Sequence, residues 1–111
     1  MSFRLSKDLK ILKPGDYSLV FSEGRIIRGK YWQVMTRPGQ DKPRLGLAIS
    51  KKAHRFAVDR NRLKRIAREV FRLNQQQLSN AEFVVMSRGK QADNTTLSGD
   101  LSRLLTQAAN S

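Results

Sequence analysis

Residues 44–72 read RLGLAISKKAHRFAVDRNRLKRIAREVFR and contain the two periodicities that decide the fold. At the start, Leu45, Leu47 and Ile49 alternate with small residues, which is typical of a strand with one buried face. Further on, apolar residues recur at helical spacing among charged ones, which predicts an amphipathic helix over about residues 60–76. Asp59 is the expected N-cap of this helix. The stretch therefore predicts a strand that leads into a long helix.

Upstream of this pair, the sequence predicts one helix and two strands. Tyr17, Val20 and Phe21 are spaced to share one face of a short helix. Residues 25–36 are rich in β-branched and aromatic side chains, which favours extended chain, and Gly29 is expected to break this segment into two strands.

Downstream, residues 82–88 are expected to form a strand around the apolar run at residues 83–86, and Asp93 or Asn94 is placed to cap a last helix. The expected order is helix, strand, strand, strand, helix, strand, helix. It predicts an α+β fold, a two-layer sandwich with a split βαβ-like sheet and helices packed over one face. We expect one domain over residues 1–111, with residues 1–13 as an irregular, partly mobile arm.

The charge balance indicates the kind of partner. Lys and Arg number 22 against 9 acids, which gives a formal net charge of +13. A polyanion such as nucleic acid would relieve this self-repulsion. The chain has no cysteine, no apolar core of a signal peptide and no apolar run long enough for a membrane span, so we expect a cytoplasmic protein without membrane contact.

The basic residues concentrate between residues 51 and 72, where only Asp59 and Glu69 are acidic. At about 100° per residue, the cations of the predicted helix occupy the arc that its apolar residues leave free. A solvated helix face normally mixes both signs, so this surface favours nucleic-acid binding. A membrane-surface helix is the alternative, but its apolar arc is needed for the core and carries one aromatic, Phe71.

The segment SKKAHRFAVDRNRLKRIAREVFR, residues 50–72, resembles the signature of the protein subunit of bacterial ribonuclease P, whose core is the Arg-Asn-Arg at residues 60–62. LKILKPGDYSLVF, residues 9–21, resembles the opening helix of that family, and RLGLAISKK, residues 44–52, its strand before the basic motif. FVVMSRG and LSGDLSRLL resemble its closing strand and helix. The resemblance covers nearly the whole chain.

In this family a catalytic RNA performs Mg²⁺-dependent hydrolysis that removes the 5′ leader of precursor tRNA, so the resemblance implies a protein that binds both RNAs. It implies an inactive isolated polypeptide, Mg²⁺ used by the RNA–protein holoenzyme and not bound tightly by the protein alone, and no obligate protein partner. The residues expected to bind the catalytic RNA are Lys51, Lys52, Arg55, Arg60, Asn61, Arg62, Lys64, Arg65, Arg68 and Arg72.

The resemblance also implies a cleft between the sheet and the helices that holds the single-stranded leader. Its expected residues are Tyr17, Phe21, Tyr31, Gln33, Met35, Gly46 and Ala48. Aromatic rings suit this role because they stack on any base. Where relatives can offer an aromatic, this chain has Met35, and Tyr31 is the substitute. The other interpretation of Tyr17 and Phe21 is that they only attach the first helix to the core.

The sequence offers little for catalysis by the polypeptide alone. His54 is the only histidine and is expected to be one more polar side chain that faces RNA. The nine acids are scattered singly, so no catalytic residue is expected. Two other functions remain open: a free-standing metal-dependent nuclease, which needs two or more acids to converge, and a structural ribosomal RNA-binding protein of similar fold.

Overall fold

The computed structural model describes residues 14–39, 43–78 and 80–109, so the expected N-terminal arm, residues 1–13, lies outside the described residues. The elements follow in the order α2 (Pro14–Glu23), β1 (Arg25–Arg28), β2 (Trp32–Pro38), β3 (Arg44–Ala48), α3 (Ala57–Asn74), β4 (Ala81–Ser87) and α4 (Asn94–Ala109). The α+β class and the predicted order of elements are confirmed, including the break between two strands at Gly29.

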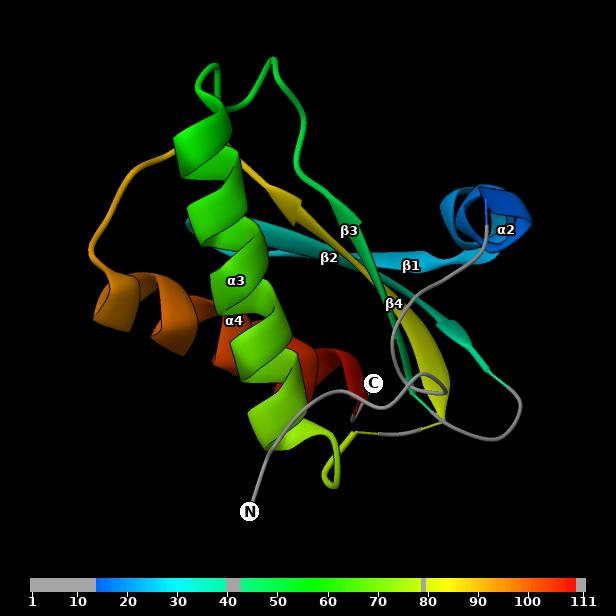
Figure 1. Cartoon of the computed structure of the whole chain (residues 1–111). Coiled ribbons are helices and arrows are strands. Elements are labelled where there is room, and N and C mark those ends of the chain that lie inside the picture. The colour runs from blue at the N-terminus through cyan, green and yellow to red at the C-terminus, as the bar shows by residue number, and fades with distance from the viewer. Residues whose placement is uncertain (1–13, 40–42, 79, 110–111) are drawn as a thin grey trace.

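The strands form one sheet in the order β1-β2-β4-β3 (Figure 1). β2 pairs antiparallel with β1 and with β4, whereas β3 and β4 are parallel and joined through α3. The predicted split βαβ arrangement is wrong in this detail, because β3 and β4 pair directly. β4 is buried from Ala81 to Val85, so its continuous apolar run is best placed in the middle of the sheet.

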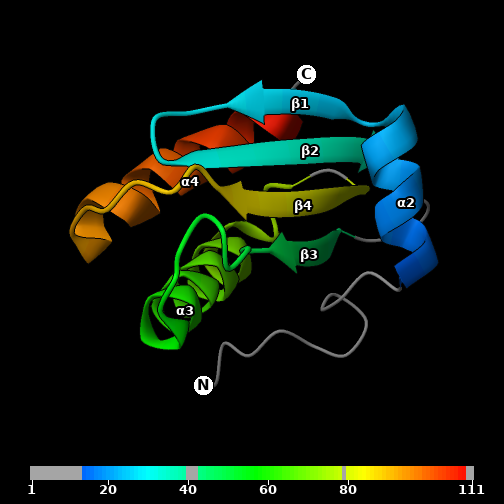
Figure 2. The same cartoon turned by 90° about the horizontal axis from the view of Figure 1, so that it is seen from above.

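α3 and α4 cover one face of the sheet and form the main core with it (Figure 2). Phe71 of α3 packs edge-on against Phe83 of β4, with ring centroids 6.1 Å apart. Trp32 is fully buried at the start of β2, and its indole Nε1 donates a hydrogen bond of 2.8 Å to the Leu97 carbonyl of α4. The indole thus gains apolar burial without leaving its N–H unpaired.

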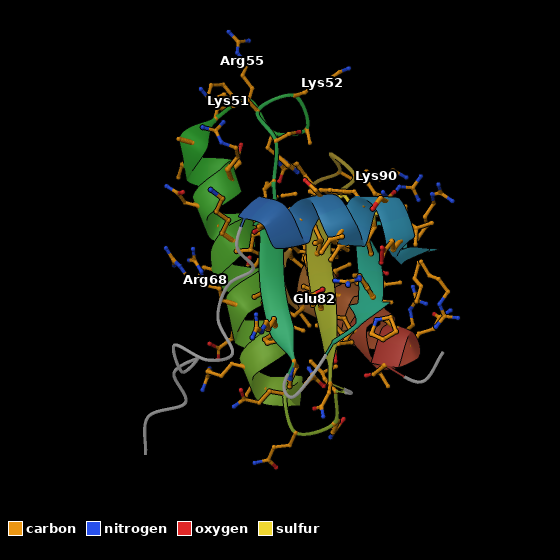
Figure 3. The ribbon with its side chains drawn as sticks, turned by 90° about the vertical axis from the view of Figure 1, so that its right-hand side faces the viewer. Lys51, Lys52, Arg55, Arg68, Glu82 and Lys90 are labelled. Carbon is orange, nitrogen blue, oxygen red and sulfur yellow. The ribbon has the colours of Figure 1, made fainter. Side chains whose placement is uncertain are left out.

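α2 lies across the opposite face, so the prediction that the helices pack over one face holds only for α3 and α4 (Figure 3). Val20 of α2 is fully buried against Val84 of β4. The reason is the composition of β4, because Val84 points away from the main core and needs an apolar cover of its own. A second, smaller core therefore holds α2 to the sheet.

α3 begins at Ala57, earlier than predicted, and its N-cap is Phe56 rather than Asp59. The Phe56 side chain makes no capping hydrogen bond, while Asp59 lies in the first turn. An acid there is favoured because the first backbone N–H groups of a helix carry partial positive charge. Asp59 thus stabilises the start of the helix by a different route from the predicted one.

The turn between β1 and β2 is fixed to α4 by Asp100. Its carboxylate accepts hydrogen bonds from the backbone N–H of Tyr31 at 3.0 Å and of Trp32 at 3.3 Å. A Cβ on Gly29 would lie 2.7 Å from the Leu104 side chain and 2.8 Å from the Asp100 carboxylate, so any larger residue would displace these side chains of α4. Burial would raise the pKa of Asp100, but the hydrogen bonds from Tyr31 and from Arg103 outweigh it and hold that pKa below its ordinary value.

Replacing Asp100 with Ala is expected to lower the free energy of unfolding by about 2–4 kcal/mol, because two part-buried N–H groups lose a charged acceptor. Urea unfolding followed by circular dichroism measures the loss. The control is Arg103→Ala, which removes an ion pair whose arginine is 59% exposed and is expected to cost about 0–1 kcal/mol. Equal losses in the two variants would contradict the role of Asp100 in fixing the turn.

The same carboxylate makes the stability depend on pH. The pKa of Asp100 is lower in the folded than in the unfolded chain, so its contribution is complete above the unfolded pKa and disappears as pH falls through the folded pKa. The stability difference between wild type and Asp100→Asn should therefore be constant near neutral pH and shrink in acid. A difference that grows in acid would contradict the assignment.

Candidate nucleic-acid interface

α3 presents its polar residues on the side that faces away from the core. Leu63, Ile66, Ala67, Val70 and Phe71 are buried, as the helical spacing predicts. Asn61, Arg65 and Arg68 are exposed, and Lys64 is partly exposed. Figure 3 shows Arg68 projecting outward from the helix.

The loop between β3 and α3 extends this surface beyond the start of the helix. Lys51, Lys52 and Arg55 are exposed and gather at one end of the molecule (Figure 3). Hydrogen bonds inside the loop hold its turn, since the Ser50 side chain accepts from Ala53 N at 3.0 Å and the Ser50 carbonyl accepts from His54 N at 3.1 Å. Below, the cationic surface means Lys51, Lys52, Arg55, Asn61, Lys64, Arg65 and Arg68.

Arg60 belongs to the predicted binding set, but its guanidinium is engaged within the protein. One of its nitrogens, Nη1, donates to the carbonyls of His54 and Arg55, each at 2.9 Å. These carbonyls precede α3 and lie outside the hydrogen-bond ladder of that helix. Arg60 therefore fixes the conformation of the loop that carries the neighbouring cations.

Arg62 joins α3 to the segment before α4. It donates to the Asn94 side chain at 2.8 Å, to the Ala92 carbonyl at 2.6 Å and to the Gln91 side chain at 3.5 Å. Three acceptors around one guanidinium use its fixed fork geometry. The two arginines of the Arg-Asn-Arg motif thus shape the surface, while Asn61 between them is exposed.

Arg72, the last cation of the predicted set, lies near the end of α3. Its guanidinium forms an ion pair with Glu69 one turn earlier. The arginine side chain is 15% exposed, so it contributes less to the surface than Arg65 or Arg68. We leave it out of the cationic surface.

His54 does not face solvent, which contradicts the prediction that it faces RNA. The residue is 3% exposed, and its imidazole Nε2 lies 2.5 Å from the Ser87 hydroxyl at the end of β4. β3 and β4 are parallel, so the chain segments that leave their carboxyl ends are neighbours and a polar side chain can join them. His54 is thus an internal anchor for the loop that carries Lys51, Lys52 and Arg55.

The sheet face beneath α2 contains most of the residues predicted for the second site. Strand pairing aligns Ile26, Met35, Val84 and Gly46 in one row across the sheet. The next row on this face consists of Arg28, Gln33, Met86 and Ala48. Gln33, Met35, Gly46 and Ala48 therefore lie on one face of the sheet, with Met86 and Val84 of β4 between the two pairs.

Tyr31 does not join them. It precedes β2 and packs against the main core on the other face of the sheet, with the Lys30 ammonium 5.4 Å from its ring centre. Simple alternation placed Tyr31 with Gln33 and Met35, but the chain is already in the turn at this position. Tyr31 is thus not positioned to replace the aromatic that relatives can offer at Met35.

Tyr17 and Phe21 differ in their surroundings. The Tyr17 hydroxyl accepts a hydrogen bond of 3.1 Å from Leu47 N of β3, and its ring packs on the smaller core. Phe21 is 47% exposed. Tyr17 therefore does attach α2 to the sheet, whereas attachment does not account for Phe21.

Two cations near the sheet face were not among the site residues predicted from the sequence. Arg88 and Lys90 follow β4 and are exposed, and Gly89 between them approaches Ala53 of the β3–α3 loop. In Figure 3, Lys51, Lys52 and Lys90 lie on one side of α2 and Glu82 lies on the other. The parallel pairing of β3 and β4 would have indicated this proximity, but the split arrangement that we expected separates the two strand ends.

Glu23, Glu82, Asp93 and Asp100 are engaged in contacts within the protein. Arg37 forms ion pairs with Glu82 at 2.8 Å and with Glu23 at 3.3 Å. Asp93 caps α4 by accepting from Thr96 N at 2.9 Å, and hydrogen bonding to the Thr96 side chain, followed by that to its backbone N–H, lowers the pKa of Asp93. Over residues 14–39, 43–78 and 80–109, no three His, Asp or Glu side chains are grouped to hold a metal ion.

None of the helices in the described ranges combines the length and the apolar character that a membrane span requires.

A mixed sheet with a crossover helix that carries a cationic surface defines an α+β nucleic-acid-binding domain. The sequence model described as Ribonuclease P matches residues 5–109. The chain belongs to the ribonuclease P protein family. This membership argues against the alternative of a structural ribosomal RNA-binding protein of similar fold.

Individual relatives agree with this assignment. The chain is 54% identical over 106 residues to the Ribonuclease P protein component of Vesicomyosocius okutanii subsp. Calyptogena okutanii, covering 94% of each chain. The structure is similar to that of a Staphylococcus aureus RNase P protein mutant with defective mRNA degradation activity, with a TM-score of 0.85, 27% identity and coverage of 92% of this chain and 89% of the other. For the Thermotoga maritima RNase P protein the TM-score is 0.75, with 32% identity and coverage of 94% and 96%.

Replacing Arg62 with Ala is expected to lower the free energy of unfolding by about 1–3 kcal/mol, since the segment before α4 loses its donors. The matched control is Arg65→Ala, in which an exposed cation of the same helix is removed and the expected change is within about 0.5 kcal/mol. Urea unfolding of both variants measures the difference. Equal stability of the two variants would contradict the structural role of Arg62.

Proposed function

We propose that the chain is the protein component of ribonuclease P, and that it binds both the catalytic RNA and the single-stranded 5′ leader of precursor tRNA. The observation that carries the proposal is the exposed cationic surface on a member of the ribonuclease P protein family. In this proposal the cationic surface binds phosphates of the catalytic RNA. Arg60, Arg62 and His54 hold the loop and the helix in position for it.

The proposal assigns hydrolysis to the RNA. Among the carboxylates that a metal-dependent nuclease could use, Glu82 is engaged with Arg37, Asp93 with the start of α4 and Asp100 with the β1–β2 turn. This donor set does not fit a protein-held Mg²⁺ site among the described residues. We therefore propose that Mg²⁺ is used by the RNA–protein holoenzyme and that the polypeptide alone is inactive.

The leader is proposed to run over the sheet face beside α2. Glu23 of α2 contacts Arg37, which also binds Glu82. Phe21 lies about 200° from Glu23 around the helix axis, so Phe21 faces the opposite side of α2. That side holds the row with Gln33, Met86 and Ala48. The polarizable thioether of Met86 adapts to different bases, which suits a substrate set of many sequences.

Charge supports the same side of α2 for the leader. Lys51, Lys52 and Lys90 lie toward the carboxyl ends of β3 and β4, while Glu82 lies beyond α2 in the other direction (Figure 3). A phosphate backbone is attracted to the end with the exposed lysines, whereas Glu82 is buried and paired with Arg37 and offers it no such attraction. The proposal includes a cytoplasmic location, which the absence of cysteine favours.

The experiment that tests the function is cleavage of a 5′-extended tRNA at low Mg²⁺ by its cognate catalytic RNA, with and without the protein. We expect efficient cleavage only in the mixture and none by the protein alone. Cleavage by protein alone would support a free-standing nuclease. No effect of the protein on an RNA that is active at high Mg²⁺ would reject the proposal.

Replacing Phe21 with Ala is expected to weaken binding of precursor tRNA about 5- to 100-fold relative to mature tRNA, because one stacking contact of about 1–3 kcal/mol is lost. The control is Leu19→Ala, since Leu19 is 40% exposed and lies on the other flank of α2. Affinities of the holoenzyme for the two tRNAs are compared by filter binding. Equal losses for precursor and mature tRNA would reject a leader site beside Phe21.

A further inference from the structure

Phe56 is an exposed aromatic residue that neither the core nor the fold of the loop explains. Its side chain is 61% exposed, and neither cluster of buried residues in the described chain includes it. It occupies the N-cap position of α3 with φ −90° and ψ 136°. A single exposed apolar side chain is common on a protein surface, so what distinguishes Phe56 is its position at the start of α3 and its cationic neighbours.

The position carries a cost in helix stability. Ser, Thr, Asp and Asn are preferred at an N-cap because their side chains accept a hydrogen bond from the first turn, and Phe56 provides none. The backbone already has the extended conformation that a capping serine needs. Asp59 lies three residues later, where the acidic partner of a capping box is found. A serine at position 56 would therefore suit the folded chain better than phenylalanine.

The backbone that carries the Phe56 ring is held in place by the contacts described above. His54, two residues earlier, is buried against Ser87, and Arg60 binds the carbonyls of His54 and Arg55. The Phe56 carbonyl accepts from Asp59 N and Arg60 N, each at 3.2 Å. The backbone on both sides of Phe56 is thus fixed before any ligand binds, which lowers the entropy that binding must overcome.

The surroundings are those of a nucleic-acid contact. The Arg55 guanidinium lies 5.7 Å from the centre of the Phe56 ring. Lys51 and Lys52 are exposed in the same loop, so the ring belongs to a strongly cationic part of the surface. An aromatic ring among cations matches the two parts of a nucleotide, because the ring stacks on the base and the cations bind the phosphates.

We propose that Phe56 stacks on an unpaired base of the catalytic RNA. This inference rests on the proposed function, and it adds a contact to a base, whereas the cationic surface contacts phosphates. Catalytic RNA is chosen over the leader because the first turn of α3 and α2 lie over different faces of the sheet (Figure 1, Figure 3). Fixing a base at this point aligns the RNA with the start of α3.

The decisive variant is Phe56→Ser, which separates stability from binding. We expect the melting temperature to rise by a few degrees because α3 gains a cap. We expect affinity for the catalytic RNA to fall about 5- to 100-fold because the stacking contact is lost. Phe56→Tyr and Phe56→Trp should retain affinity, while Phe56→Leu, which keeps apolar area without a π face, should not.

Salt dependence identifies the kind of contact. Phe56→Ser removes no charge, so the slope of log affinity against log salt should equal that of wild type. Arg65→Ala, by contrast, should reduce the slope by about 0.7–0.9. Val58→Ala is the matched control, since Val58 is apolar, 73% exposed and lies two residues after Phe56, in the first turn of α3. The affinity of this variant for the catalytic RNA should stay within twofold of wild type.

The outcomes separate this inference from the function on which it rests. If wild type binds the catalytic RNA and Phe56→Ser binds equally well, stacking by Phe56 is rejected while the function stands. If Phe56→Leu binds as wild type does, the contact is apolar and the stacking proposal is also rejected. If Phe56→Ser weakens only precursor tRNA, the base belongs to the substrate, and the assignment to catalytic RNA is overturned. If wild type fails to bind the catalytic RNA, the proposed function itself fails.

Discussion

Burial of β4 on both faces is the constraint from which the rest of the structure follows. Phe83 and Val85 point into the main core under α3 and α4, while Val84 points to the other side, under α2. A strand buried in this way needs partners on both edges, and it has β2 on one and β3 on the other. The parallel pairing with β3 requires a long crossover, which is α3. The same pairing brings the loops after β3 and β4 together at one end of the sheet.

The described cations are not all exposed to a partner in the same way. Arg37, Arg60 and Arg62 donate to carboxylates and carbonyls within the protein, and they set the positions of α2, the β3–α3 loop and the segment before α4. The exposed cations of the β3–α3 loop and of α3 belong instead to the cationic surface. A charge of +13 is therefore not all available to a partner, because part of it is used to hold the surface in shape.

Local patterns in the sequence predicted the elements well and the long-range contacts less well. Alternation separated Trp32 and Val34 from Gln33 and Met35, and helical spacing predicted the buried side of α3. His54 and Tyr31 were placed wrongly because their positions depend on contacts with Ser87 and with the main core, which lie far away in the sequence. Arg62 was expected to bind the catalytic RNA, whereas its guanidinium binds acceptors that lie 29 to 32 residues further along the chain. Spacing within a helix carries no information about such partners.

The two edge strands of the sheet affect the tendency of the free protein to aggregate before it binds RNA. β1 is a short edge strand of four residues, with an exposed arginine at each end of its Ile-Ile pair. On β3, the other edge, the Tyr17 hydroxyl occupies the Leu47 N–H. Short length, charge and occupied donors all discourage a foreign strand from adding to a sheet. A newly made copy is thus protected against edge-to-edge aggregation by features that have no part in recognition.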